Sequence, residues 1–276
     1  MKHSSLMQAY RHMLAAILMV ALTVMVPANS AAAAPGKTGN DEILVFAASS
    51  LAPPLQQIAR LYEERNGIKL RFAFASSAAL ARQIEYGAPA DLFITAHPLW
   101  LERLAERQRI DMADVQAIAG NSLVLARPAA SAHSTANIRT LLLAQDTGRI
   151  ATGDPGSVPL GMYARSSLKA LGLWETVGPR LAPAANARAA LLQVERGLVG
   201  LGILFASDAA GSDRVTIIAE IPAGPAGSTG SDGRIQYLAV LVGQPPASKT
   251  AAQFLLYLTS PEAQEVFLKQ GFSAPE

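Results

Sequence analysis

Short apolar runs alternate with helical segments through the first third of the chain. Strand-like runs at residues 42–48, 69–75 and 91–96 are each too short for a helix. Each is followed by a segment with helical periodicity, and these helices end near Gly67, Gly87 and Arg107. Strands that alternate with helices in this order predict parallel strands joined by right-handed crossovers. The pattern therefore predicts an α/β fold.

The rest of the chain continues the alternation and ends with two helices. Further strands are expected at 122–126, 149–152, 200–205, 215–221 and 237–242. Residues 222–233 are rich in Gly, Ser, Pro and Ala and predict a mobile loop. The final helices, beginning near Ser248 and Ser260, suggest a return to the first part. We therefore expect lobe 1 at residues 41–120 plus 244–276 and lobe 2 at residues 121–243, joined by the strands at 122–126 and 237–242.

Small or hydroxyl residues stand between strand and helix at four points. Two are serine pairs, which end at Ser50 and Ser77, and two are the helix starts at Leu160 and Ala187. Any one serine is explained by an ordinary N-cap role. Four such points at the carboxyl ends of strands instead predict helix N-termini that converge on one cleft. Backbone N–H groups and hydroxyls there could surround a small anion without arginine or lysine.

The first 34 residues have the features of a secretory signal peptide. Lys2 and Arg11 precede an apolar run at residues 13–26, and small residues follow at 31–34. The run of about 14 residues is short for a membrane span, so a retained N-terminal anchor is the less favoured alternative. Cysteine is absent, which excludes disulfides and lipid attachment through a thiol. These features indicate a periplasmic protein.

Removal of the leader makes the chain electrically neutral. The 23 Lys and Arg residues lose Lys2 and Arg11, which leaves 21 against 21 Asp and Glu residues. With no basic run in the sequence, the charge balance gives no support for a nucleic-acid partner.

Signatures of catalysis are missing from the sequence. After the leader the only histidines are His97 and His133, and neither lies in a metal or triad motif. Asp91, Asp154 and Asp208 lie near strand ends, where we interpret them as caps or surface groups. We therefore expect no enzyme activity, no catalytic residues, no bound metal cation and no cofactor.

Five segments together resemble the periplasmic molybdate-binding proteins of ABC transporters. They are VFAASSL (45–51), FASSAALARQIEYGAPADLFITA (74–96), GNSLVLA (120–126), GDPGSVPLGMYA (153–164) and LGILFASDA (201–209). The second segment is the most specific, and the resemblance spans nearly the whole chain after the leader. It implies the two-lobed type II periplasmic binding protein fold, with a mixed, mostly parallel sheet in each lobe and the ligand in the cleft.

The resemblance also assigns ligand-binding residues. It implies that the hydroxyls of Ser50 and Ser77 and the backbone amides of Leu160 and Ala187 hold the oxyanion, so that molybdenum is bound through oxygen rather than as a cation. The family more often has alanine where Leu160 stands. A tyrosine hydroxyl of the family corresponds to Phe205, and phenylalanine cannot donate a hydrogen bond.

The function implied is capture of molybdate and its delivery to an ABC permease in the inner membrane, by a protein expected to be a monomer. Molybdate is fully deprotonated at neutral pH, so a site made only of donors suits it, whereas hydrogen phosphate carries a proton that needs an acceptor. Sulfate would have to be rejected by size. The alternatives are tungstate or another oxyanion, and an effector-sensing domain of a regulator, against which the signal peptide argues.

Overall fold

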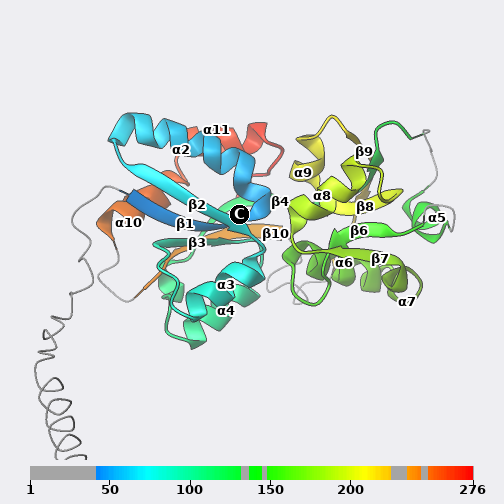
Figure 1. Ribbon diagram of the computed structural model, residues 1–276, viewed down its shortest axis with the longest axis horizontal. Helices are drawn as coiled ribbons and strands as arrows, with labels where there is room; N and C mark the ends of the chain where they lie inside the picture. Colours follow the sequence, from blue (N-terminus) through cyan, green and yellow to red (C-terminus); the bar gives the residue numbers. More distant parts are fainter. Residues whose placement is uncertain (1–41, 132–136, 145–147, 225–234, 244–247, 276) are drawn as a thin grey trace, which may run out of the picture. The chain divides into compact units, whose positions relative to one another are not determined.

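The computed structural model describes residues 42–131, 137–144, 148–224, 235–243 and 248–275. The predicted signal peptide and most of the loop predicted at 222–233 lie outside these residues. The described residues form one compact unit with two five-stranded sheets (Figure 1). Within that part of the chain, every helix is too short or too polar to cross a membrane.

The first sheet has the strand order β2-β1-β3-β10-β4. Its strands are β1 (Glu42–Ala48), β2 (Lys69–Ala75), β3 (Leu92–Thr95), β4 (Gln116–Asn121) and β10 (Ile235–Leu241). β1 pairs in parallel with β2 and β3, which confirms the predicted parallel arrangement, and β10 is antiparallel to both β3 and β4.

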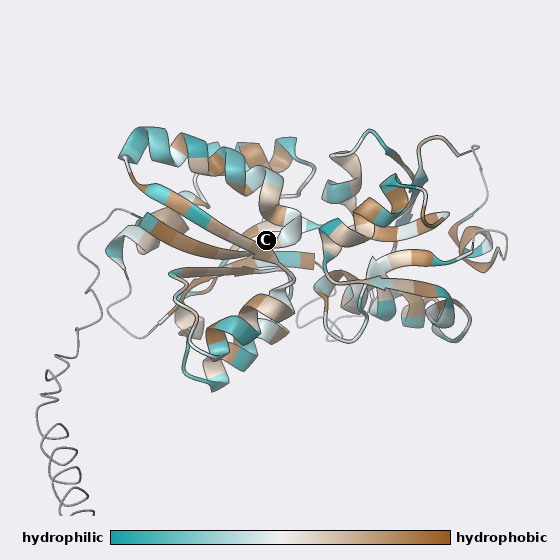
Figure 2. Ribbon diagram, viewed as in Figure 1, coloured by the Kyte–Doolittle hydropathy of each residue, from teal (hydrophilic) through white to brown (hydrophobic). Residues whose placement is uncertain are grey.

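Helices cover both faces of the first sheet. They are α2 (Ala52–Asn66), α3 (Ser77–Glu85), α4 (Leu99–Glu106), α10 (Lys249–Tyr257) and α11 (Pro261–Lys269). Val45 of β1 packs in one hydrophobic cluster with Leu55 of α2, while its neighbour Phe46 packs in the other with Leu80 of α3. Because both faces are buried, β1 is apolar along most of its length (Figure 2). Figure 1 shows α2 and α11 on the opposite side of this sheet from α3 and α4.

The second sheet has the strand order β7-β6-β8-β5-β9. Its strands are β5 (Leu123–Pro128), β6 (Ile150–Gly153), β7 (Leu181–Ala184), β8 (Leu201–Phe205) and β9 (Val215–Ile221). The helices beside it are α5 (Ile138–Leu143), α6 (Pro159–Ala170), α7 (Trp174–Val177), α8 (Ala187–Glu195) and α9 (Ala206–Ala210). β6 is parallel to β7 and β8, whereas β5 is antiparallel to β8 and β9. Two mixed sheets with flanking helices confirm the predicted α/β two-lobed fold.

The chain passes between the sheets twice. It runs from β4 directly into β5, and it returns from β9 to β10. Pairing of β10 with β3 and β4 puts residues 235–241 in the first sheet, although the predicted boundary at residue 243 counted them with lobe 2. The other predicted lobe limits stay a prediction.

Strand β4 is an element that the sequence pattern did not predict. Its last residues, Gly120 and Asn121, are typical of a turn. Here Gly120 pairs with Ser273 near the C-terminus, donating its N–H to the Ser273 carbonyl at 2.8 Å and accepting one in return at 3.0 Å. A Cβ at position 120 would overlap the Ser273 side chain, so glycine lets these two segments approach without moving that side chain.

Candidate functional site

A small cavity between the two sheets brings the four predicted strand-to-helix points together. Its lining residues are Ala48, Ser49, Ser50, Ala75, Ser76, Ser77, Ala96, Val158, Pro159, Leu160, Ala187 and Phe205. All five residues predicted for the ligand-binding site are among them. The lining residues from the described part of the chain include no ionisable side chain, so any polar contact here comes from hydroxyl and backbone groups.

Ser50 lies in a single 3₁₀ turn, Ser49–Leu51, between β1 and α2. Its side chain is buried, and no side chain caps this turn. The Ser50 Oγ lies 2.7 Å from the phenolic oxygen of Tyr237, which belongs to β10. Ser50 is therefore not a helix cap, and its hydroxyl lies between the cavity and a buried tyrosine.

The second serine pair divides two roles between its members. Ser76 is the N-cap of α3, since its Oγ accepts a hydrogen bond from the Ala79 N–H at 3.3 Å. Ser77, the first residue of α3, is fully buried, and its Oγ accepts from the Ala96 N–H at 3.1 Å. Because the Ser77 oxygen is the acceptor of this bond, the hydroxyl proton of Ser77 is available to an acceptor in the cavity. The ordinary N-cap interpretation thus applies to Ser76 and not to Ser77.

The start of α6 is placed by close backbone packing. Pro159 occupies the first helical position, where its missing N–H costs nothing, and the N–H of Leu160 lies in the first turn, which has no intrahelical acceptor. A Cβ on Gly161 would come within 2.5 Å of the Asp154 carbonyl oxygen, and one on Gly153 within 2.8 Å of the Gly161 nitrogen. Glycine at both positions therefore lets α6 approach the end of β6 closely.

The start of α8 has a conventional side-chain cap. Asn186 Oδ1 accepts from the Ala189 N–H at 2.9 Å, which confirms the predicted cap. The N–H of Ala187 lies in the first turn, ahead of the capped position. With the α6 start, this gives two helix N-termini at one cavity, and both direct partial positive charge toward it. Such a site stabilises an anion without any cationic side chain.

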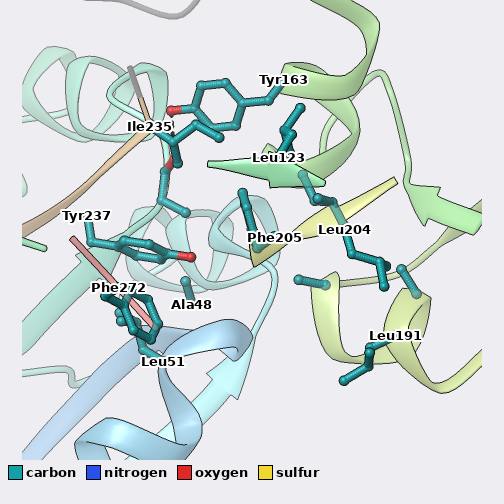
Figure 3. Packing of buried hydrophobic residues seen from close by; sticks show 14 of the residues in the cluster. Ala48, Leu51, Leu123, Tyr163, Leu191, Leu204, Phe205, Ile235, Tyr237 and Phe272 are labelled. Atoms are coloured by element: carbon teal, nitrogen blue, oxygen red, sulfur yellow. Dashed lines mark hydrogen bonds between the residues drawn. The ribbon is translucent and has the colours of Figure 1, made fainter. Parts of the chain in front are cut away.

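Phe205 ends β8 and is buried among aromatic rings. Its ring centroid lies 6.5 Å from that of Tyr163 and 6.1 Å from that of Tyr237, both edge to face (Figure 3). Neither tyrosine lines the cavity. The Tyr163 hydroxyl donates to the Ala96 carbonyl at 2.9 Å. Within the described residues, therefore, neither of these tyrosine hydroxyls takes the place of the donor that Phe205 lacks.

Two buried ionisable groups, His97 and Asp208, follow the lining residues Ala96 and Phe205 within three positions of the sequence. Burial lowers the pKa of His97 to about 4, and its Nδ1 accepts from the Leu99 N–H at 3.2 Å. Burial raises the pKa of Asp208 to about 6, although an ion pair with Arg188 at 3.2 Å acts in the opposite direction. Both groups shift toward their neutral forms, as desolvation requires.

Two further acids predicted to be caps or surface groups, Asp91 and Asp154, form hydrogen bonds to the backbone. Asp91 Oδ2 accepts from the Leu44 N–H at 2.9 Å, and Asp154 Oδ1 accepts from the Gly156 N–H at 2.9 Å within a turn. Among the residues that the structure describes, no group of three His, Cys, Asp or Glu side chains could hold a metal ion. His133 lies outside those residues.

Sequence reasoning missed part of the lining and the residues behind it. Ser49, Ser76 and Val158 line the cavity. They could have been predicted because each lies within two positions of a predicted site residue in the sequence. Two missed residues support Ser50 without lining the cavity. The Tyr237 hydroxyl lies 2.7 Å from Ser50 Oγ, and Asn121 Nδ2 lies 3.2 Å from the Tyr237 hydroxyl. They are 187 and 71 positions from Ser50 in the sequence, so no local pattern connects them.

Comparison with known proteins identifies the family. Residues 43–273 match the family model described as bacterial extracellular solute-binding protein. Two curated relatives are molybdate-binding proteins ModA, from Escherichia coli (42% identical; 84% of this chain, 89% of the relative) and Haemophilus influenzae (37%; 84% and 90%). A solved periplasmic molybdate-binding protein from Azotobacter vinelandii matches with a TM-score of 0.71 at 23% identity, over 85% of this chain and all of that one, and supports the fold. The chain therefore belongs to the bacterial extracellular solute-binding protein family, within which ModA proteins are its relatives.

Proposed function

We propose that the protein binds molybdate in the cavity between its two lobes and delivers it to an ABC permease in the inner membrane. One observation carries the proposal: two serine hydroxyls and two helix N-termini, one pair from each sheet, line a single cavity, and the described residues that line it include no charged side chain. The similarity to two ModA proteins supports molybdate as the oxyanion.

The polarity of the donors suits a fully deprotonated anion. Ser77 Oγ already accepts a hydrogen bond from the Ala96 N–H, so its own proton is left for the ligand. The N–H groups of Leu160 and Ala187 can only donate. An oxyanion without a proton leaves none of these donors unsatisfied, whereas a protonated one would bring a donor that needs an acceptor. Tungstate has the same charge and almost the same size, so we expect it to compete.

The protein acts as a carrier in this proposal. It holds the anion through hydrogen bonds and returns it unchanged, with no catalytic residue and no cofactor, as a monomer in the periplasm. The Tyr163 hydroxyl on α6 donates to the Ala96 carbonyl at the end of β3, and so ties the two lobes together beside the cavity. We propose that the form closed by such contacts is the one presented to the permease.

Calorimetric titration of the purified protein with molybdate tests the proposal. We expect one anion per chain, competition by tungstate and weak or no binding of sulfate and phosphate. Ser77→Ala should weaken molybdate binding about 10- to 100-fold, the scale of one lost hydrogen bond to a charged group. Ser260→Ala is the matched control, because it removes a hydroxyl that caps α11 in the same way as Ser76 caps α3 and that does not line the cavity. If micromolar protein shows no binding heat and no thermal shift with molybdate, molybdate is ruled out as the substrate.

A further inference from the structure

Behind Ser50, three side chains form a continuous hydrogen-bonded chain. The Ser50 Oγ lies 2.7 Å from the Tyr237 hydroxyl, which lies 3.2 Å from Asn121 Nδ2. The same amide nitrogen donates to Ser207 Oγ at 2.8 Å. Asn121 ends β4, Tyr237 belongs to β10 and Ser207 belongs to α9, so the chain lies where the polypeptide crosses between the sheets. Figure 3 shows the Tyr237 hydroxyl directed from β10 toward the region of Ala48 and Phe205.

Backbone groups fix the orientation of the Asn121 amide. Asn121 Oδ1 accepts from the Ser122 N–H at 2.9 Å and from the Ser207 N–H at 3.4 Å. A backbone N–H is always a donor, so the amide oxygen must face these two groups. The amide nitrogen must then face the Tyr237 hydroxyl. Because an amide nitrogen only donates, the Tyr237 oxygen is the acceptor of this bond.

The Tyr237 proton consequently has one available acceptor. In the described part of the chain, the partners of this hydroxyl are Asn121 Nδ2, which cannot accept, and Ser50 Oγ. Tyr237 is fully buried, and burial raises its pKa above the ordinary value, so the phenol keeps its proton. The short Ser50–Tyr237 bond therefore runs from the tyrosine O–H to the serine oxygen.

Ser50 is thus set up in the same way as Ser77. Each serine oxygen accepts one internal hydrogen bond, from the Tyr237 hydroxyl in one case and from the Ala96 N–H in the other. Each serine proton is left for the cavity that both residues line. A fixed backbone amide orients Ser77, whereas Ser50 depends on a side chain more than 180 positions away in the sequence.

We propose that Tyr237, oriented by Asn121, is a positioning residue that holds the Ser50 hydroxyl as a donor and thereby makes the site selective for oxyanions that carry no proton. The proposal rests on the proposed function of this site. If Ser50 turned to accept a hydrogen bond from a protonated anion, its own proton would compete with the Tyr237 proton for the same space. Hydrogen phosphate is therefore disfavoured relative to molybdate.

A double-mutant cycle of anion affinity tests whether Tyr237 acts through Ser50. Molybdate is titrated calorimetrically into the wild type, Tyr237→Phe, Ser50→Ala and the double variant. We expect Tyr237→Phe to weaken binding about 10-fold and Ser50→Ala about 10- to 100-fold. The double variant should match Ser50→Ala within about twofold, since the tyrosine has no route to the anion without the serine. Independent losses that multiply in the double variant would overturn the proposal.

Selectivity gives a readout that a purely structural role would not change. The ratio of molybdate to phosphate affinity should fall several-fold in Tyr237→Phe, because Ser50 becomes free to accept from the proton of hydrogen phosphate. An unchanged ratio would contradict the proposed selectivity. Tyr257→Phe is the matched control: it removes a hydroxyl that donates to Glu262 at 2.8 Å, in a residue of α10 that does not line the cavity. It should leave the affinity and the ratio unchanged.

Thermal unfolding without ligand tests the bond direction separately. If Tyr237 donates, Ser50→Ala leaves a buried phenolic proton without an acceptor, and the melting temperature should fall by about 3 °C or more. Adding Tyr237→Phe should restore part of this loss. A Ser50→Ala protein as stable as the wild type would overturn the assigned direction. Failure of the wild type to bind molybdate would refute the proposed function instead, and the melting temperatures would still decide the direction of the bond.

Discussion

The two halves of the cavity are lined by different parts of the chain. The first sheet contributes side-chain hydroxyls, Ser50 and Ser77, from turns after β1 and β2. The second sheet contributes the backbone starts of α6 and α8, at Leu160 and Ala187. The first half therefore depends on residue identity. The second half depends on where the backbone lies, and we expect it to tolerate different side chains at the positions that line the cavity.

The difference explains how each half is supported. Ser77 and Ser50 need partners that fix the direction of a hydroxyl, and these are the Ala96 N–H and the Tyr237 hydroxyl. The helix starts need fixed positions, which come from glycine packing beside α6 and from the Asn186 cap at α8. Substitutions in the two halves should accordingly fail in different ways.

The largest effect is expected at Gly161, in the second half. Gly161→Ala places a Cβ within 2.5 Å of the carbonyl carbon and oxygen of Asp154, and closer still to the Gly153 carbonyl oxygen. Backbone cannot move aside cheaply, so α6 must shift. We expect a loss of about 2–4 kcal/mol in the free energy of unfolding. The Leu160 N–H should be displaced as well, with molybdate binding weakened at least 100-fold.

Urea unfolding and calorimetry of the folded variant measure the two effects of Gly161→Ala. Gly172→Ala is a useful control, because Gly172 follows α6 with a positive φ of 66° and its Cβ would meet nothing within 4 Å. It should cost stability through backbone strain alone and leave the anion affinity unchanged. Near-wild-type binding by Gly161→Ala would show that the position of α6 is not what sets the second half of the site.

The next effect separates neighbouring serines in the first half. Ser77→Ala should weaken molybdate binding by about 1.5–3 kcal/mol and cost stability as well, because the Ala96 N–H loses its acceptor. Ser76→Ala should cost about 1 kcal/mol of stability through the lost cap, with a change in affinity of less than about threefold. Calorimetry with thermal melts gives both quantities. Equal losses of affinity in the two variants would refute the division of roles.

The sequence predicted the serines of the first half of the site better than the residues that orient their hydroxyls. Serine pairs after short strands are a local signal, and the described structure places Ser50 and Ser77 together as predicted. The helix starts at Leu160 and Ala187 were also visible, through Pro159 and Asn186. No local signal could assign the hydroxyl partner of Ser50, because Tyr237 becomes its neighbour only through pairing of β10 with β4 and β3.

The prediction of the fold is likewise limited where an element depends on residues far away in the sequence. Most strands and helices followed from periodicity and caps, since their apolar faces are set by nearby residues. β4 did not, because Gly120 and Asn121 are typical of a turn and are held extended by Ser273 from the far end of the chain. The lining of the second half likewise depends on Gly153 and Gly161, whose contact across the end of β6 is tertiary.

Lowering the pH should change the contributions of His97 in the first lobe and Asp208 in the second lobe to stability in opposite directions. His97 follows β3 of the first sheet, and its pKa falls to about 4, so its contribution to stability is present above about 6.5 and is lost as the pH falls toward 4. Asp208 lies on α9 in the second lobe, and its pKa rises to about 6. The folded protein then binds the proton more tightly than the unfolded chain, so this group's contribution falls as the pH rises from about 4 to 6.

Paired variants separate these two contributions. Between pH 6 and pH 4, Asp208→Asn should lose more stability on acidification than the wild type, and His97→Gln should lose less. Each difference should be on the order of 1–2 kcal/mol. Chemical denaturation at pH 4, 6 and 7.5 measures them. If the free energy of unfolding changes with pH equally in both variants and the wild type, neither His97 nor Asp208 contributes to the pH dependence of stability.

The smallest effect is expected at Phe205, the side chain from the second sheet that lies between the two tyrosines (Figure 3). Phe205→Tyr would add a side-chain donor to the half that otherwise binds through backbone. We expect molybdate to bind more tightly by up to about 1.4 kcal/mol, or tenfold. The ligand-free protein should lose up to about 1 kcal/mol of stability, because the buried hydroxyl then lacks its anionic partner.

Titrations with molybdate, tungstate and sulfate, with melts of the ligand-free protein, distinguish the outcomes for Phe205→Tyr. Phe72→Tyr, on β2 and outside the cavity lining, controls for the added hydroxyl and should leave affinity unchanged. A less stable protein with unchanged affinity would mean that the new hydroxyl points into the aromatic cluster, and that the donor set is complete without it. Tighter binding would instead show that the second half can also use a side-chain hydroxyl. The lack of such a donor in this half would then be due to phenylalanine at position 205 and not to the arrangement of its strands and helices.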